Sequence, residues 1–276
     1  MPTELAPAKV NLCLYLGPRR DDGYHLLASI FEPVTLHDRL TIEEAERDEV
    51  ICPGVEGENL AALALRLLRS EGWEAPPLRI EIEKQIPVAA GLGGGSADAA
   101  AVLRLAAGEM EDLAGLAALI GADVPSQMQP MPCLVEGTGQ KIGSIAQPAE
   151  HWLVLLPAER GLSTASVFAT ADRLGLGRTA GELAEASARL WAVASNGVSP
   201  LEYPGLLVND LEPAATSLMP EIGEAKDRLA DAGAPFVGMT GSGPTVFGLF
   251  PTEQEARQTA ERVGESAMVC QGGKAP

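Results

Sequence analysis

The order of apolar and polar residues along the chain predicts a mixture of strands and helices. Every second residue is apolar, the pattern of a half-buried strand, over residues 10–16, 34–42 and 78–82, except that Asp38 interrupts the second of these. Residues 60–68 place apolar side chains at i, i+3, i+4, i+7 and i+8, which predicts an amphipathic helix. An alanine-rich helix is expected after the glycines near residue 95, followed by a shorter helix that ends near Ile120.

A second series of strands and helices begins at residue 151. The run WLVLLP predicts a buried strand, and PFVGMTGSGPTVFGLF predicts two short strands around a Gly-Ser-Gly turn. Helices are expected over residues 163–174, 180–194, 211–218, 222–232 and 253–263, and a last strand over residues 267–270. A chain of 276 residues is long for one domain. The two blocks therefore predict an α+β fold with two domains, residues 1–150 and 151–276.

The charge of the chain narrows the classes of partner. It has 20 Lys and Arg residues against 38 Asp and Glu, a formal net charge of −18. This balance repels nucleic acids and anionic membranes, so we expect a small-molecule partner. An anionic ligand would have to be held by local dipoles and a few placed cations. Alternatively, the acidity serves only solubility.

Neither the N-terminal stretch nor the pattern of cysteines indicates export. The N-terminal stretch MPTELAPAKVNLCLYLG lacks the basic start and apolar run of a signal peptide. No window approaches the roughly 20 apolar residues of a membrane span. Cys13, Cys52, Cys133 and Cys270 are scattered without a C-x-x-C pair, which favours reduced thiols over disulfides or a zinc site. We therefore expect a cytoplasmic protein.

The stretch GLGGGSADAAAVL, residues 91–103, predicts a phosphate-binding loop. Glycines remove side chains that would keep backbone amides away from a phosphate. A helix that begins directly after them adds unpaired N–H groups and the positive end of its dipole, and Ser96 is expected to cap it. The loop lacks the lysine of a Walker A motif, and Ser96 stands where the third glycine of G-x-G-x-x-G belongs. A flexible connection or close helix–strand packing is the alternative interpretation.

Three stretches resemble the motifs of the GHMP kinases, which phosphorylate small molecules such as galactose, homoserine, mevalonate and phosphomevalonate. They are PAKVNLCLYL near the N-terminus, PVAAGLGGGSADAA in the middle and GMTGSGPTVFGLF near the C-terminus, in the order of that family. The resemblance implies an N-terminal domain like ribosomal protein S5, a ferredoxin-like C-terminal domain and a cleft between them. It also implies ATP and Mg²⁺ as cofactors.

The elements DGYH and GADVP are similar to one subfamily of these kinases. Its acceptor is a cytidine-diphosphate-linked methylerythritol, an intermediate of the non-mevalonate route to isoprenoid precursors. The resemblance thus implies ATP-dependent phosphorylation of the 2-hydroxyl of that alcohol. The sequence makes no prediction of the oligomeric state.

Asp123 and Lys9 are the candidate catalytic residues. Taken alone, Asp123 lies between Gly121 and Pro125, where a helix cap is the simplest interpretation, and Lys9 has the place of a solvated lysine at a strand edge. The resemblance makes Asp123 the base that accepts the hydroxyl proton and places Lys9 beside it, where an ammonium favours the developing alkoxide. Asn11 lies on the same side of the strand as Lys9 and resembles a substrate contact.

The resemblance also assigns the nucleotide site. Asn59, Leu60 and Lys84 resemble parts of an adenine pocket, although Asn59 fits equally well as a helix cap and Leu60 as a core residue. Ser96 or a neighbour is expected to hold Mg²⁺ directly or through water. The residues expected to wrap the ATP phosphates are Pro87, Val88, Ala89, Ala90, Gly91, Leu92, Gly93, Gly94, Gly95, Ser96 and Ala97.

A cytidine pocket is implied by Tyr24 and His25, with Phe168 as the opposing aromatic wall. Stacking on aromatic rings contributes about 1–3 kcal/mol per base in other contexts. From the residues alone, Tyr24 and His25 fit a turn with partly buried rings. Gly241 and Ser242 belong to the second glycine turn, which lies near the acceptor in the family.

The stretch 126–142 departs from the subfamily pattern. Ser126 replaces the usual aromatic, and Gln140 stands where an acid is common, so the resemblance does not predict the acceptor wall next to Asp123. Two other functions compete with the main prediction. A homoserine- or mevalonate-type kinase has no use for an aromatic base slot such as DGYH. A non-catalytic ligand sensor on the same fold has no use for the Lys9–Asp123 pair.

Overall fold

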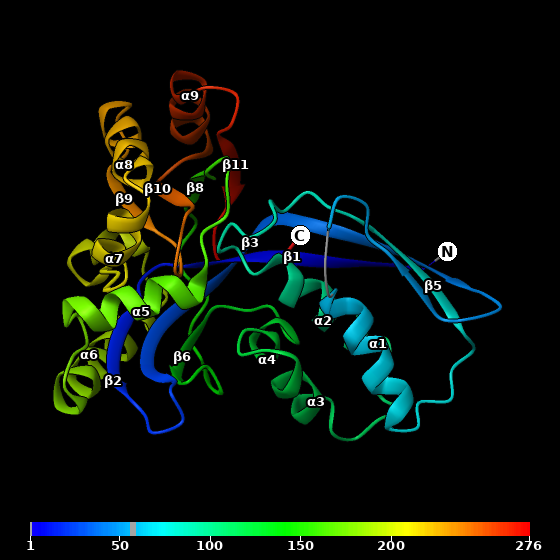
Figure 1. Cartoon of the computed structure of the whole chain (residues 1–276). Coiled ribbons are helices and arrows are strands. Elements are labelled where there is room, and N and C mark those ends of the chain that lie inside the picture. Colours follow the sequence, from blue (N-terminus) through cyan, green and yellow to red (C-terminus); the bar gives the residue numbers. More distant parts are fainter. Residues whose placement is uncertain (1, 56–58) are drawn as a thin grey trace.

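The computed structural model describes residues 2–55 and 59–276, which form two β-sheets with helices packed against them (Figure 1). The first sheet has the strand order β4-β5-β3-β6-β7, with β1 and β2 also paired to β3. Its strands are β1 (Thr3–Asn11), β2 (Tyr15–Arg19), β3 (His25–Glu44), β4 (Glu49–Ile51), β5 (Leu78–Glu83), β6 (Cys133–Gly137) and β7 (Lys141–Ser144). The helices of this half are α1 (Leu60–Ser70), α2 (Gly94–Arg104), α3 (Leu113–Ile120) and α4 (Val124–Gln127).

The long strand β3 organises the first sheet. One half of it pairs with β2 and β6, and the other half pairs with β1 and β5. In Figure 1 it runs beside β1 across the width of the molecule. Residues that lie on β1 and β3 are thereby held in one antiparallel register, which fixes Lys9 opposite Pro33 and Asn11 opposite Phe31.

The alanine-rich sequence after the glycine loop forms α2, which packs between β1 and α1. Every residue from 97 to 103 is buried, and four of these seven are alanines. Small side chains let the helix approach the sheet closely, so its first turn and the preceding loop lie directly beside β1. The alanine run therefore explains how the loop is brought to Lys9, whose backbone amide donates to the carbonyl of Leu92 at 3.0 Å.

The second sheet has the order β11-β8-β10-β9, with all pairs antiparallel. Its strands are β8 (Trp152–Leu156), β9 (Phe236–Met239), β10 (Val246–Phe250) and β11 (Met268–Gln271). Its helices are α5 (Thr164–Leu174), α6 (Ala180–Ala194), α7 (Glu212–Leu218), α8 (Glu221–Asp231) and α9 (Glu253–Val263), with short 3₁₀ turns at Pro200–Glu202 and Pro204–Leu206. The predicted α+β fold class is confirmed. In the described part of the chain, no helix combines the length and apolarity that crossing a membrane requires.

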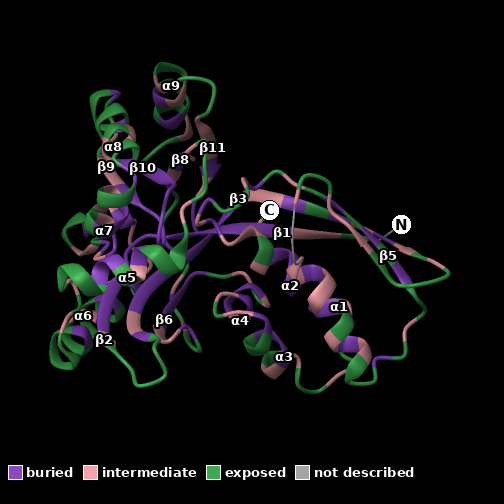
Figure 2. Ribbon diagram, in the orientation of Figure 1, coloured by how far each residue is buried: buried purple, intermediate pink, exposed green. Residues whose placement is uncertain are grey.

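The two sheets share one apolar core. In Figure 2 the ribbon is purple, the colour of buried residues, where the sheets meet. The cluster joins Val10 of β1 with Leu153 of β8 and Phe247 of β10, all fully buried. A β-bridge between Val34 and Gly272 adds a backbone link between the sheets. The change from one sheet to the other falls between β7 and β8, but packing is continuous across it.

Several local expectations were wrong. The single strand expected over residues 10–16 is interrupted between Asn11 and Tyr15, because Leu14 turns to the other half of the chain and forms a bridge with Asn209. Ser96 does not cap α2; the helix begins earlier, after Gly93, which occupies the cap in a left-handed conformation. Strands β6 and β7, which both begin in the atypical stretch, and the short strand β4 were not predicted.

The four cysteines are free, and Cys13, Cys133 and Cys270 are buried. Burial raises the pKa of each of these three thiols to about 12. They are therefore unreactive core residues at neutral pH.

A buried ion pair links the two halves. His151, just before β8, and Glu32 on β3 are 0% and 1% exposed in their side chains, with 2.9 Å between His151 Nε2 and Glu32 Oε2. The other ring nitrogen, Nδ1, faces the carbonyl of Ala149 at 2.9 Å. Burial alone lowers the pKa of His151, but the hydrogen bond and charge of Glu32 outweigh it and raise that pKa above its usual value.

We predict that His151→Gln lowers the free energy of unfolding by about 3 kcal/mol, because Glu32 then loses its buried partner. Since the folded pKa of His151 is raised, its charge contribution is fully present below about pH 6.5 and is lost as pH rises through the folded pKa. Urea unfolding at several pH values measures both effects. His37→Gln is the matched control, since the His37 ring contacts a carbonyl two residues away, that of Thr35, rather than a buried carboxylate. A stability difference that is the same at all pH values would contradict the pairing.

Candidate active site

Two cavities meet at the glycine loop. The first, about 440 Å³, lies over the loop and the start of α1; the second, about 680 Å³, lies between β1, α5 and the loop before α4. Gly91, Gly93 and Thr164 line both cavities. A molecule in one cavity would therefore meet a molecule in the other at this part of the loop.

The conformation of the loop requires glycine at Gly91. Its φ is +77°, and a Cβ there would lie 2.7 Å from the carbonyl oxygen of Gly243 and 3.0 Å from that of Thr240. The loop thus lies directly against the second glycine turn, between β9 and β10. Ala89, with φ of 55°, is also left-handed, an uncommon conformation outside glycine. The loop is a tightly constrained structure, not a flexible connection.

The first cavity has the features of an anion site. Because α2 begins at Gly94, the amides of its first turn have no acceptors within the helix, and the positive end of its dipole faces the cavity. The cavity is lined by ten of the eleven residues expected to wrap phosphates, Pro87 to Ser96. The eleventh, Ala97, is fully buried in the core behind the loop and does not line the cavity.

Asn59, Leu60 and Lys84 also line the first cavity. The Asn59 side chain caps α1, accepting from the amides of Ala61 at 2.8 Å and Ala62 at 3.3 Å. The Lys84 ammonium is bound by two carboxylates, Asp38 and Asp98 (below). The structure therefore gives Asn59 and Lys84 structural contacts in addition to their places on the cavity wall.

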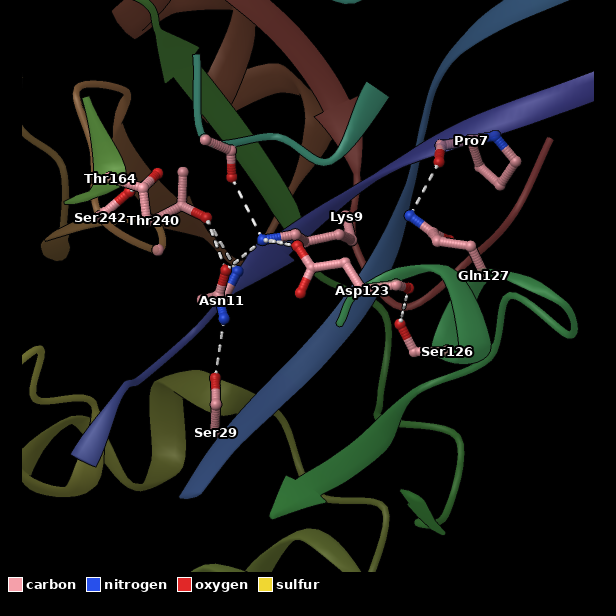
Figure 3. A network of polar contacts seen from close by, with 12 residues as sticks. Pro7, Lys9, Asn11, Ser29, Asp123, Ser126, Gln127, Thr164, Thr240 and Ser242 are labelled. Atoms are coloured by element: carbon pink, nitrogen blue, oxygen red, sulfur yellow. Dashed lines mark hydrogen bonds and ion pairs between the residues drawn. The ribbon is translucent and has the colours of Figure 1, made fainter. Parts of the chain in front are cut away.

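Lys9 and Asp123 lie side by side at the junction of the cavities (Figure 3). Lys9 Nζ is 3.3 Å from Asp123 Oδ2, and the lysine side chain is 6% exposed while the aspartate is 35% exposed. Asp123 does occupy the cap position of α4, but its carboxylate makes no capping hydrogen bond. The carboxylate is instead directed to Lys9 and open to the second cavity.

Further contacts hold Lys9 in place. Its ammonium donates to Asn11 Oδ1 at 2.5 Å and to the carbonyl of Gly91 at 3.3 Å, and it lies 4.8 Å from the ring centre of Phe31. Asn11 in turn donates to Ser29 Oγ at 2.9 Å, so its amide orientation is set by its neighbours. The lysine, the asparagine and the glycine loop therefore form one connected polar network.

The second glycine turn closes this network. The backbone amide of Asn11 donates to Thr240 Oγ1 at 2.9 Å, and the Ser242 and Thr164 hydroxyls are 2.9 Å apart. Gly241 and Ser242, predicted to lie near the acceptor, both line the second cavity.

The far end of the second cavity is lined by aromatic rings. His25 and Phe168 have ring centres 5.4 Å apart, tilted by 39°, and Tyr24 is 66% exposed at the rim. His25 Nε2 lies 2.7 Å from Asp172 Oδ1. The three aromatic residues predicted for a base pocket are thus brought together from β3, the preceding turn and α5.

Sequence reasoning missed other residues of this cavity, including Arg19, Phe31, Thr138, Thr164 and Asp172. Asp172 follows Phe168 by one helical turn, so the helix predicted over 163–174 was a usable signal for it. Nothing in the local sequence marks Thr138, which reaches the cavity only through the pairing of β6 with β3.

The atypical stretch, residues 126–142, contributes little to the second cavity. The Ser126 hydroxyl donates to the backbone carbonyl of Asp123 at 2.7 Å, which steadies the residue that carries the carboxylate. Gln140 accepts from the amide and hydroxyl of Thr138, at 2.6 and 2.8 Å. Among the described residues of this stretch, Thr138 is the one that lines the second cavity.

Comparisons with known proteins identify relatives along nearly the whole chain. The GHMP kinases N terminal domain model matches residues 59–135, and the GHMP kinases C terminal model matches residues 178–269. A 4-diphosphocytidyl-2-C-methyl-D-erythritol kinase of Parvibaculum lavamentivorans is 40% identical over 283 residues, covering 94% of this chain and 92% of that protein. One of Mycolicibacterium smegmatis is 41% identical over 259 residues, covering 88% and 80%.

Comparisons with solved structures agree with these sequence comparisons. A crystal structure of 4-(cytidine 5'-diphospho)-2C-methyl-D-erythritol kinase matches with a TM-score of 0.81 at 35% identity, covering 99% of this chain and 100% of that one. A homoserine kinase of Cytophaga hutchinsonii has a TM-score of 0.73 at 18% identity, covering 99% and 94%, and shows the fold alone. The resemblance carried by the sequence motifs is confirmed.

We predict that Gly91→Ala weakens ATP binding at least about tenfold, because the new Cβ must push the loop away from Gly243 and Thr240. Titration calorimetry with Mg·ATP measures the effect. Gly108→Ala is the matched control: its φ is +86°, but no atom lies within 4 Å of the new Cβ. It should lower stability by about 1 kcal/mol and leave ATP binding unchanged. Equal ATP affinity in the two variants would show that the contact at Gly91 does not shape the site.

Proposed function

Because this chain belongs to the GHMP kinase family, among the 4-diphosphocytidyl-2-C-methyl-D-erythritol kinases, we propose that it transfers the γ-phosphoryl group of ATP to the 2-hydroxyl of 4-diphosphocytidyl-2-C-methyl-D-erythritol. The single observation that carries this proposal is the junction of two cavities at Gly91 and Gly93, beside the Lys9–Asp123 pair. Phosphoryl transfer needs donor and acceptor to meet in line at one point.

Asp123 acts as the base. Its carboxylate is one-third exposed, faces the second cavity and makes no capping bond, so it is open to an acceptor hydroxyl. It accepts the hydroxyl proton as the new oxygen–phosphorus bond forms and the bond to the departing ADP breaks. The Lys9 ammonium offsets the negative charge that develops on the reacting oxygens.

The glycine loop binds the ATP phosphates. The unpaired amides at the start of α2 and the helix dipole supply positive potential without adding side-chain charges. This suits a chain whose net charge is −18. Asn59 and Leu60 form the adenine end of the same cavity, which Lys84 also lines where it lies beneath Gly94.

Mg²⁺ fits this site through oxygen donors. The described residues contain no group of three or more His, Cys, Asp or Glu that could hold a metal ion. Mg²⁺, however, commonly keeps waters and binds through phosphates with only one or two protein oxygens. Ser96 lines the first cavity, so its hydroxyl oxygen is suited to that role, directly or through water. When bound, the ion would neutralise phosphate charge.

The aromatic end of the second cavity holds the cytosine. Tyr24, His25 and Phe168 offer ring faces for stacking, and the cavity volume of about 680 Å³ accommodates a nucleotide-linked alcohol. Asn11, which accepts from Lys9, and Ser242 line the same cavity and contact the alcohol part of the acceptor. A homoserine- or mevalonate-type acceptor would leave the aromatic end empty.

A non-catalytic sensor is the competing function from another class. The buried Lys9 with a carboxylate open to the cavity argues against it, since binding alone does not need a base beside an ammonium.

We also propose that the protein works in the cytoplasm on this small molecule, without nucleic acid or membrane.

We predict that Asp123→Asn lowers kcat by about 10² to 10⁴ while the dissociation constant for Mg·ATP stays within about twofold. The change keeps the shape of the side chain and removes only its ability to accept the proton. ADP release with the cytidyl acceptor measures kcat, and calorimetry measures ATP binding.

Asp112→Asn is the matched control, because Asp112 caps α3 through Gly115 and asparagine serves as an equally good cap. It should leave kcat unchanged. Full activity of Asp123→Asn would remove Asp123 as the base, and loss of ATP binding would mean that it belongs to the nucleotide site instead.

A further inference from the structure

Three charged side chains meet at the start of α2, and two of them, Lys84 and Asp98, line the first cavity. Asp38 comes from β3, Lys84 directly follows β5, and Asp98 belongs to α2. Their side chains are 0%, 14% and 4% exposed. Lys84 Nζ donates to Asp38 Oδ2 and, at 2.8 Å, to Asp98 Oδ2. One ammonium therefore joins a strand of the central sheet to the helix that carries the loop.

Asp38 also holds the chain that leads into the loop. Its second oxygen, Oδ1, accepts from the backbone amides of Gln85 at 2.6 Å and Ile86 at 2.8 Å. These two residues immediately precede Pro87, where the loop begins. The start of the loop is thus fixed to β3 by hydrogen bonds to a carboxylate, which are stronger than those to a neutral acceptor.

Lys84 holds the other end of the loop. Besides its bond to Asp98, its ammonium lies beneath the first residue of α2, where a Cβ built on Gly94 would be 3.2 Å away. Both ends of the glycine loop are therefore attached to the same buried residue, Asp38, one directly and one through Lys84. The loop spans two fixed points that the sheet determines.

Stability alone is a weak reason for such a cluster. Burying three charged groups costs several kcal/mol per ion, and well-packed apolar residues in their place are often equally stable. Burial is also the main cause that raises the pKa of Asp98 to about 7, against the opposing charge of Lys84. Asp98 Oδ1 has no hydrogen-bond partner in the described part of the chain.

We propose that Asp38, Lys84 and Asp98 form a clamp that positions the glycine loop for the phosphates of ATP, so that Lys84 acts through the loop rather than by contact with adenine. The inference rests on the proposed function in one respect, that ATP is the phosphate donor. A loop with four glycines has high conformational freedom, and ordering it only when ATP arrives would lower affinity. The clamp removes that cost in advance.

The test separates a phosphate effect from an adenine effect. In Lys84→Met/Asp98→Asn the ammonium and one of its carboxylate partners lose their charges together, while Asp38 keeps its two backbone bonds. Mg·ATP binding is measured by calorimetry, and adenosine binding by competition against ATP. We expect the dissociation constant of Mg·ATP to rise at least about tenfold and that of adenosine to change less than about twofold. At saturating ATP, kcat and the KM of the acceptor should stay within about twofold.

Glu212→Gln/Lys226→Met is the matched control. It removes an ion pair between α7 and α8, outside both cavities, and should leave both affinities unchanged. Equal losses for adenosine and ATP in the clamp variant would overturn the proposal in favour of adenine contact. Unchanged affinities in a folded clamp variant would overturn it in favour of a purely structural role.

A second variant covers the case in which the double variant does not fold. Lys84→Arg keeps a cation that can bind both carboxylates, so ATP and adenosine affinities should stay within about threefold of the wild-type values. A joint loss of both affinities would contradict the clamp. Failure of the proposed function itself has a different result, since the wild-type protein would then not bind Mg·ATP at all.

Discussion

The Lys9 ammonium is the constraint on which the site depends. A charge buried this deeply costs several kcal/mol unless it is paired and hydrogen-bonded, and three segments supply the partners. Asp123 comes from the start of α4, the Gly91 carbonyl from the glycine loop, and Asn11 from β1 itself. The contacts that satisfy the charge therefore also bring a carboxylate and the phosphate loop to one point. Misplacing any of the three segments would remove one of the partners of the ammonium, so the pairing and the active geometry stabilise each other.

The wider fold keeps that point fixed. β3 pairs with strands on both of its halves, and the two sheets share a core that joins Val10, Leu153 and Phe247. The glycine loop is held by the network around Lys9, and its two ends are held by Asp38, Lys84 and Asp98. Packing against Gly243 leaves no room for a side chain at Gly91. A loop that looks flexible in sequence is thus ordered from three directions, which favours binding because little freedom remains to be lost.

The sequence predicted elements whose signals are local. Helices α1, α5, α6 and α9 lie where their periodicity and caps indicate, and β5, β8 and β10 lie on their apolar patterns. Strands β6 and β7 were missed because both are short, and because β6, to which β7 is paired, itself pairs with β3, about a hundred residues away in sequence. Motifs predicted Lys9, Asp123, Tyr24 and His25 as site residues. The clamp was not predicted, because Asp38 appeared only as an interruption in a strand pattern and Asp98 as an ordinary residue of a helix. Contacts between side chains far apart in sequence have no local signal to detect.

The central claim is that phosphate passes from ATP to the cytidyl alcohol at the Lys9–Asp123 pair. The most direct measurement is transfer of labelled γ-phosphate from Mg·ATP to 4-diphosphocytidyl-2-C-methyl-D-erythritol, with homoserine and mevalonate tested in parallel and the product identified by ³¹P NMR. We predict a single labelled phosphomonoester on the 2-hydroxyl of the cytidyl acceptor, and none on the other two alcohols. Label found on homoserine or mevalonate, or only in inorganic phosphate, would contradict the account.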